Sequence, residues 1–185
     1  MATIDCFSWE DVDRLSRQLA AKIDQSFDVI VCIMRGGAVP GVILANELNI
    51  DRVLGMKVAQ KGQVTAVLPT SSTGNMAPYQ GQCGEVIVPM NDLDLTDLKV
   101  LVVDDVLDSG ESARLVMDDV RRRGAGNVQL ATLHIKSYSR FKSDYYMEEK
   151  TNWLFYPWMS TVELEKMQAR LTEAEQVTST DKEAL

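Results

Sequence analysis

The sequence contains few of the residues that build disulfide frameworks and metal clusters. It has three cysteines, Cys6, Cys32 and Cys83, an odd number without metal-ligand spacing, and a single histidine, His134. This cysteine usage provides no disulfide scaffold and fits a reducing compartment, so we expect a cytoplasmic protein. Cys32 and His134 lie in apolar, strand-like runs. We expect Cys32 to be a small core residue and His134 to be a satisfied interior group rather than a catalyst.

Long apolar runs and a surplus of basic residues are also absent. No run reaches the roughly 18–20 apolar residues that span a membrane, and Asp5, Glu10 and Asp11 stand where a signal peptide would be basic and then apolar. Acidic residues number 27 against 19 basic ones, for a net charge of −8. This balance argues against a nucleic-acid-binding surface. We therefore expect no membrane span and no nucleic-acid partner.

What the sequence does contain is an alternation of buried strands and amphipathic helices. With 185 residues, 45% of them apolar, the chain can form one domain with a sizeable core. The alternation predicts an α/β fold, a central parallel sheet flanked by helices, with ligands at the carboxyl ends of the strands. The predicted strands are residues 27–33, 53–58, 100–103 and 128–136, and the predicted helices are residues 12–23, 39–48 and 113–123.

Two segments depart from this alternation. Residues 59–84 are polar and rich in Gly, Ser, Thr and Gln, and a loop of this length is typical of a flexible lid. Residues 160–185 begin with helical spacing and become polar beyond Glu175, where we expect fraying. A terminal helix of this kind is typical of a packing or subunit contact.

The most informative stretch is Val-Leu-Val-Val-Asp-Asp-Val-Leu-Asp-Ser-Gly-Glu-Ser at residues 100–112. Its four leading apolar residues indicate a buried strand, which we expect to end at Asp104 and Asp105. Paired carboxylates in that position suit the hydroxyls of a sugar or a Mg²⁺ ion.

The small-residue loop at residues 108–112 predicts a phosphate cradle. A helical pattern begins directly after it, at Ala113. Free backbone N–H groups, the positive end of the helix dipole and the hydroxyls of Ser109 and Ser112 can all donate to an anion. Gly110 lets the backbone approach that anion closely.

This motif resembles the phosphoribosyl pyrophosphate (PRPP) motif of type I phosphoribosyltransferases. Segments at residues 8–12, 33–41 and 152–158 also resemble the helix start, the Arg-Gly-Gly loop and the base-binding arm of the bacterial xanthine-guanine (6-oxopurine) enzymes of that family. The resemblance covers most of residues 8–159.

The resemblance implies an organisation into a domain and a tail. A phosphoribosyltransferase domain is expected at residues 1–159, with the lid at about residues 59–84 and a small base-binding hood at about residues 145–159. The remaining residues, 160–185, are expected to form a C-terminal helix and polar tail outside the resemblance.

The resemblance also assigns roles in binding PRPP. Arg35, Gly36 and Gly37 match the pyrophosphate loop, where glycines allow close backbone contact and arginine can pair with two oxygens. Asp104 and Asp105 match the acids that meet the ribose hydroxyls and the cofactor Mg²⁺, with Asp105 as the metal ligand and Asp104 as a second candidate.

The loop that follows is expected to wrap the 5′-phosphate through Asp108, Ser109, Gly110, Glu111 and Ser112. Asp108 matches the general base near N7 of a purine, and the alternative is a loop acid that caps the next helix. Glu111 is acidic where the family often has a neutral or basic residue, which leaves the loop unaffected if its side chain points outward.

Three residues match the family's base-binding positions. Lys136 is expected to donate to the exocyclic oxygen at C6 of a purine, although a solvated lysine at a strand end is the alternative. Trp153 is expected to stack on the base, and the backbone of Leu154 to contact its edge.

The implied enzyme is a purine-salvage transferase that moves the 5-phosphoribosyl group of PRPP to N9 of a 6-oxopurine and releases pyrophosphate. The alternatives are a type I phosphoribosyltransferase for another base and a non-catalytic regulator of the same fold that senses PRPP or a nucleotide. The expected partners are PRPP and a purine base, and a homo-oligomer, dimer or tetramer, is expected from the resemblance alone.

Overall fold

The fold is built on a six-stranded sheet of mostly parallel strands. The computed structural model describes residues 3–58, 86–87 and 93–183, so the predicted lid lies outside the described residues. The strand order is β4-β3-β2-β5-β6-β7, and every pair is parallel except the antiparallel pair of β3 and β4. This confirms the predicted central parallel sheet. Its strands are β2 (Val29–Ile33), β3 (Val53–Val58), β4 (Val86–Ile87), β5 (Lys99–Leu107), β6 (Asn127–Lys136) and β7 (Tyr145–Lys150).

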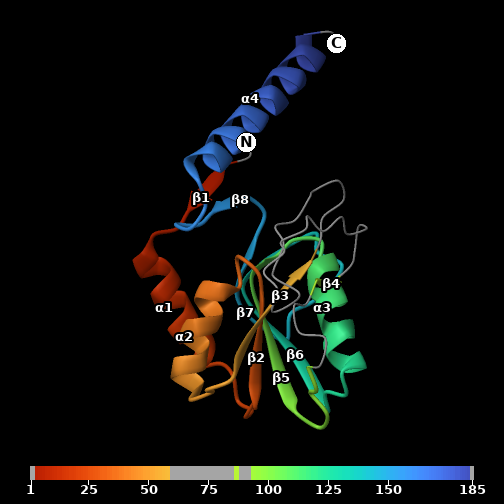
Figure 1. Cartoon of the computed structure of the whole chain (residues 1–185). Helices are drawn as coiled ribbons and strands as arrows, with labels where there is room; N and C mark the ends of the chain where they lie inside the picture. Colours follow the sequence, from red (N-terminus) through yellow and green to blue (C-terminus); the bar gives the residue numbers. More distant parts are fainter. Residues whose placement is uncertain (1–2, 59–85, 88–92, 184–185) are drawn as a thin grey trace, which may run out of the picture.

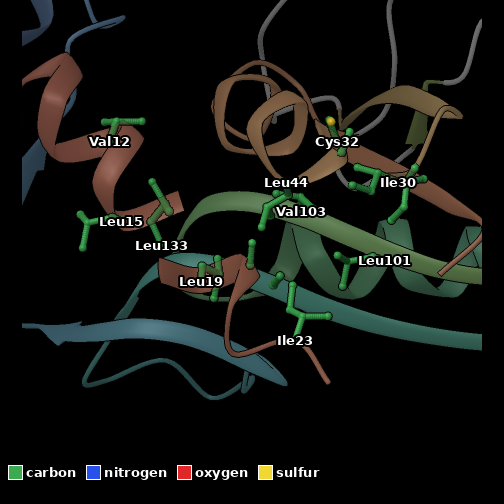
Figure 2. Packing of buried hydrophobic residues seen from close by; sticks show 14 of the residues in the cluster. Val12, Leu15, Leu19, Ile23, Ile30, Cys32, Leu44, Leu101, Val103 and Leu133 are labelled. Carbon is green, nitrogen blue, oxygen red and sulfur yellow. The ribbon is translucent and has the colours of Figure 1, made fainter. Parts of the chain in front are cut away.

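Helices cover both faces of this sheet (Figure 1). Helices α1 (Trp9–Ala20) and α2 (Ala38–Leu48) pack on one face, and α3 (Glu111–Arg122) packs on the other. Side chains alternate along β2, so that Ile30 and Cys32 belong to the α1–α2 core cluster (Figure 2). The other residues of β2 face α3. The run is apolar throughout because both faces of the sheet are covered.

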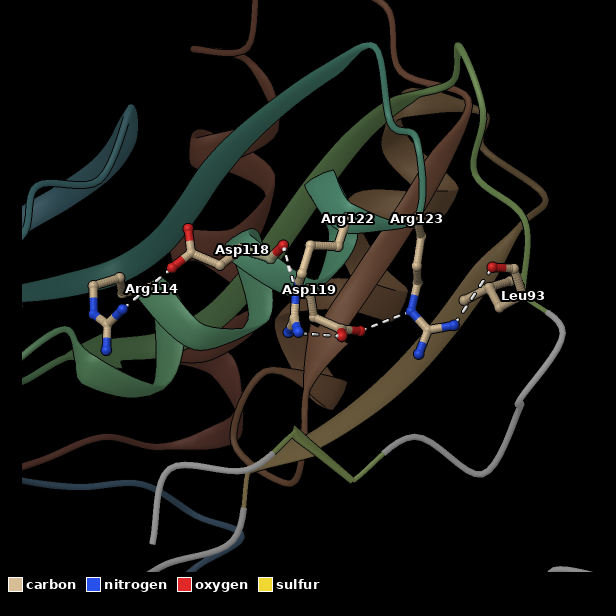
Figure 3. Close-up of polar contacts among 6 residues, drawn as sticks. All are labelled: Leu93, Arg114, Asp118, Asp119, Arg122 and Arg123. Carbon is tan, nitrogen blue, oxygen red and sulfur yellow. Dashed lines mark hydrogen bonds and ion pairs between the residues drawn. The ribbon is translucent and has the colours of Figure 1, made fainter.

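Side-chain hydrogen bonds stabilise the start of α1 and the end of α3. The Ser8 hydroxyl accepts from the Asp11 amide at 3.1 Å, and the Ser8 amide donates to the Asp11 carboxylate at 3.0 Å, a capping box that starts α1. At the end of α3, Arg123 donates to Asp119 at 2.7 Å and to the carbonyl of Leu93 at 3.4 Å (Figure 3). These contacts tie α3 to the segment that leads into β5.

The boundary between β5 and α3 differs from the prediction. β5 continues past Asp104 and Asp105 to Leu107, because its pairing with β6 extends to Leu107 opposite Ile135. Helix α3 begins at Glu111, two residues before the predicted start, after Gly110 in the left-handed region with φ 82°. The paired acids therefore lie within a strand, and only a three-residue loop separates that strand from the helix.

A second, two-stranded sheet lies beyond the main one. β1 (Ile4–Cys6) pairs in parallel with β8 (Trp153–Phe155). The predicted hood at residues 145–159 is therefore divided, because β7 joins the main sheet through its pairing with β6. The other strand of the predicted hood, β8, pairs with the N-terminal strand β1 in the small sheet.

The C-terminal helix, α4 (Thr161–Glu183), leaves the body of the molecule beside this small sheet (Figure 1). The helix continues to Glu183, and the expected fraying beyond Glu175 stays a prediction. Among the helices that the structure describes, none is long and apolar enough to cross a membrane.

Candidate active site

Asp104 and Asp105 place two adjacent carboxyl groups near the carboxyl end of β5. Desolvation raises the pKa of Asp104 well above its usual range, and the adjacent Asp105 carboxylate raises it further. Desolvation also raises the pKa of Asp105, against hydrogen bonds that include one from the Trp158 side chain. Within the described part of the chain, neither carboxylate forms an ion pair. The two carboxyl groups therefore suit a divalent cation or a diol.

The predicted pyrophosphate loop packs directly on these carboxyl groups. It follows β2, contains a cis peptide bond between Met34 and Arg35, and leads into α2. A Cβ atom at Gly36 would overlap the Asp105 carboxylate, and one at Gly37 would overlap the carbonyl oxygen of Val103. Two glycines are needed because the loop backbone touches the end of β5.

The predicted phosphate loop surrounds a small cavity of about 80 Å³ at the start of α3. The Ser109 hydroxyl accepts from the amide of Glu111 at 3.3 Å, and the Glu111 side chain is exposed. Gly110 has a positive φ of 82° and packs against Phe141, so a side chain there would be strained and would clash. The lining consists of Asp104, Val106, Leu107, Asp108, Ser109, Gly110, Glu111, Ser112 and Ala113.

A larger cavity of about 340 Å³ lies beside the phosphate loop. It brings together the predicted catalytic acid Asp108 and the predicted base-binding residues Lys136, Trp153 and Leu154. Asp105 and Asp108 reach it from β5 and the loop that follows, Lys136 from the end of β6, and the other two from β8. The complete lining is Asp105, Val106, Asp108, Lys136, Tyr138, Thr151, Trp153, Leu154, Tyr156, Met159 and Met167.

Lys136 is held at this cavity rather than solvated. Its side chain is 8% exposed, and its ammonium donates to the backbone carbonyl of Asn152. Desolvation lowers the Lys136 pKa, while the nearby Asp108 carboxylate opposes that effect. Trp153 is 37% exposed, so its ring is accessible beside the cavity. The ring of Trp153, the hydrogen-bond donor of Lys136 and the carboxylate acceptor of Asp108 thus line the same cavity.

The phosphoribosyl transferase domain family matches residues 8–164. The chain belongs to this family. It is similar to xanthine-guanine phosphoribosyltransferases of Roseobacter denitrificans (28% identical, covering 82% of each chain) and Cereibacter sphaeroides (29% identical, covering 82% of this chain and 84% of that one). A purine phosphoribosyltransferase structure from Pyrococcus horikoshii is similar with a TM-score of 0.68 and 28% identity, covering 85% of this chain and 94% of that one.

This phosphoribosyltransferase has a tyrosine at its site that the sequence did not single out. The Tyr138 hydroxyl donates to the Asp108 carboxylate at 2.6 Å. Because Asp108 accepts this hydrogen bond, the pKa of Tyr138 is raised to about 12. Tyr138 follows Lys136 by two residues, but nothing in the sequence links it to an acid 30 residues earlier.

Behind the site, a buried pair supports the backbone of β5. The Tyr156 hydroxyl donates to the carbonyl of Asp105 at 3.2 Å and lies 2.7 Å from Nδ1 of His134. His134 is buried, as expected, but in the part of the chain that the structure describes only one of its two ring nitrogens has the expected hydrogen-bond partner. Its Nε2 atom is buried without a hydrogen-bond partner among the described residues.

The residues of this phosphoribosyltransferase fit a Mg²⁺ ion. No group of three or more His, Cys, Asp or Glu side chains that could hold a metal occurs in the described ranges. Mg²⁺ keeps several waters and is commonly bound through one or two carboxylates and substrate oxygens, which Asp104 and Asp105 match. Both carboxylates are desolvated and lack an ion-pair partner among the described residues.

Proposed function

We propose that this phosphoribosyltransferase transfers the 5-phosphoribosyl group of PRPP to N9 of a 6-oxopurine, namely xanthine, guanine or hypoxanthine, and releases pyrophosphate. The two curated relatives named above are xanthine-guanine enzymes, and the structure from Pyrococcus horikoshii is a purine enzyme. These names support a purine as the acceptor. The preference for a 6-oxopurine among purines depends on the side chains that line the cavity.

The observation that carries this choice is the buried ammonium of Lys136 beside Asp108 and Trp153. An ammonium has donors and no acceptor, so it favours a base with an oxygen at C6 over one with an amino group. The indole of Trp153 can stack on any base, so it adds affinity without selecting the substituent. Selection among bases therefore falls to Lys136.

The remaining groups have roles that follow from their positions. Asp108 would hold or accept the proton at N7 of the purine as N9 attacks, a contribution of about 10²–10⁴-fold for a general base. Asp104 and Asp105 would meet the ribose hydroxyls and the metal, and Arg35 would pair with the leaving pyrophosphate. Mg²⁺, when bound, would supply positive charge to the PRPP oxygens.

The 5′-phosphate would occupy the cavity at the start of α3. Backbone N–H groups from Ser109 to Ser112 and the helix dipole supply the donors there. The exposed side chain of Glu111 has no role in this binding, because backbone N–H groups contact the phosphate. This placement leaves the ribose between the phosphate cavity and the base cavity, next to the paired acids.

Several expectations accompany the proposal. The organisation into residues 1–159 and 160–185, the lid at residues 59–84, a cytoplasmic location and a homo-oligomeric state stay predictions.

A panel of bases tests the proposed function. Purified protein with PRPP and Mg²⁺ would be given xanthine, guanine, hypoxanthine, adenine, uracil and orotate, and pyrophosphate release would be measured. We expect turnover with at least one 6-oxopurine and a kcat/KM for adenine at least about tenfold lower, the cost of losing one charged hydrogen bond. Preferred use of adenine or a pyrimidine would overturn the proposal, and no release with any base would favour the regulator.

A further inference from the structure

We propose that the first turns of α4 form an outer wall of the base cavity, in which Met167 contacts the bound base and Arg170 orients Trp153. We call these two residues the α4 wall. The proposal rests on the base-binding role of the cavity proposed above. It gives a substrate-binding role to a helix that the sequence pattern assigned to packing or subunit contact.

Met167 lines the cavity from outside the main sheet. It shares the cavity of about 340 Å³ with Lys136, Trp153 and Asp108, and it is partly buried there. Its thioether side chain is unbranched and polarisable, so it can adapt to a flat ring and make a favourable sulfur–aromatic contact. Met167 therefore offers the base an apolar surface in addition to the ring of Trp153.

Arg170 acts on the stacking residue itself. The guanidinium carbon of Arg170 lies 5.9 Å from the ring centroid of Trp153, within the range of a cation–π contact. Met167 and Arg170 are three residues apart, so they project from the same face of α4. One face of the helix thus contributes both a cavity-lining side chain and a contact that restrains the indole.

The start of α4 is fixed beside the cavity. Met159 lines the cavity, and its amide donates to the carbonyl of Tyr156 at 3.0 Å. The Ser160 amide donates to the Glu163 carboxylate at 2.8 Å, while the Glu163 amide donates to the Ser160 hydroxyl at 3.3 Å. This capping box sets where α4 begins and hence which face it turns toward the cavity.

The α4 wall lies outside the part of the chain that the family shares. The family match ends at residue 164, before Met167 and Arg170. Neither of the two hydrophobic clusters includes a residue of α4 among those described. The contact of α4 with the cavity is therefore not a by-product of core packing, and it lies beyond the residues that the family model matches.

Full-length variants test the α4 wall. The KM values for PRPP and for the best base of the panel would be measured for Met167→Ala and Arg170→Gln, with Gln168→Ala as the exposed control on the same helix. We expect the base KM to rise about 2–10-fold for Met167→Ala and about 2–5-fold for Arg170→Gln. The PRPP KM and the kcat should stay at their wild-type values, and the control should match wild type.

Other outcomes would overturn the proposal. An unchanged base KM in both variants would place α4 outside the site. Equal increases in the KM values for base and PRPP would indicate a structural role, as would a change that appears only with an altered oligomeric state in size-exclusion chromatography. Failure of the proposed function is separable from these results, because it would appear in the wild-type protein before any variant is made.

Discussion

At the scale of single residues, the base cavity depends on side chains from separate strands that meet through a few polar contacts. The sequence predicted Asp108, Lys136 and Trp153, because each lies beside an end of a strand and matches a position of the family it resembles. The structure brings them to one cavity. It could not predict Tyr138 beside Asp108, since that contact depends on how two loops pack. Hydrogen bonds between loops follow no periodic sequence pattern, so a single sequence does not reveal them.

Asp108→Asn should keep the fold and PRPP binding but lower kcat by about 10²–10⁴-fold, because the amide cannot accept the purine proton as a base. Stopped assays of pyrophosphate release would measure kcat, and isothermal titration calorimetry would measure PRPP affinity. Asp51→Asn, an exposed acid at the amino end of the sheet, is the control. Turnover near the wild-type level in Asp108→Asn would remove the proton-acceptor role.

Lys136→Ala should raise the base KM about 10–150-fold, because a charged hydrogen bond at a buried site contributes about 1.5–3 kcal/mol. The PRPP KM should change far less. Lys142→Ala, an exposed lysine outside the cavity lining, should behave as wild type. If the KM values for base and PRPP rose together, Lys136 would instead serve the phosphates or the fold.

The single histidine allows a direct test of burial behind the site. Desolvation lowers the pKa of His134 from 6.5 to about 4, so the folded protein binds fewer protons than the unfolded one between these values. The stabilising effect of a neutral His134 is present above pH 6.5 and is lost as the pH falls through about 4. The imidazole NMR signals of the only histidine should therefore titrate near pH 4, and in urea near pH 6.5. A folded-state midpoint at 6 or above would contradict this burial.

At the scale of elements, the sequence predicted the buried strands well and their ends less well. The apolar runs of β2 and of the first half of β5 follow from helices on both faces of the sheet. The extension of β5 through Asp104 and Asp105 was missed, because pairing with β6 continues where the apolar pattern stops. β7 consists of exposed and half-buried residues, and only its partner strand decides which sheet it joins.

Gly37→Ala tests the contact between the pyrophosphate loop and β5. The added Cβ would overlap the carbonyl oxygen of Val103, so backbone must move, at a cost of about 1–3 kcal/mol in the free energy of unfolding. We expect a lower melting temperature together with a higher KM for PRPP. Gly126→Ala, just before β6, would place its Cβ 3.2 Å from the backbone oxygen of Asp97 and should affect stability without changing the PRPP KM. A normal PRPP KM in Gly37→Ala would show that this loop does not contribute to PRPP binding.

At the scale of the whole molecule, the core and the C-terminal helix are separable. Both hydrophobic clusters lie between the main sheet and its helices α1, α2 and α3, with the small sheet joined to one of them through β8. The described residues of α4 add nothing to either cluster, although Met167 reaches the base cavity. Folding and base affinity should therefore respond differently to removal of this helix.

Two truncations test that separation. A chain ending at Leu171 keeps the α4 wall, so its base KM should stay within about twofold of wild type. A chain ending at Ser160 removes Met167 and Arg170, and its base KM should rise about 2–10-fold, the range of the contacts that are lost. Because the core clusters stay complete, we expect both chains to unfold cooperatively within a few degrees of the wild-type melting temperature in circular dichroism. If the shorter chain lost cooperative unfolding, α4 would be shown to stabilise the domain. If its base KM were unchanged, the cavity would be shown to bind the base without α4.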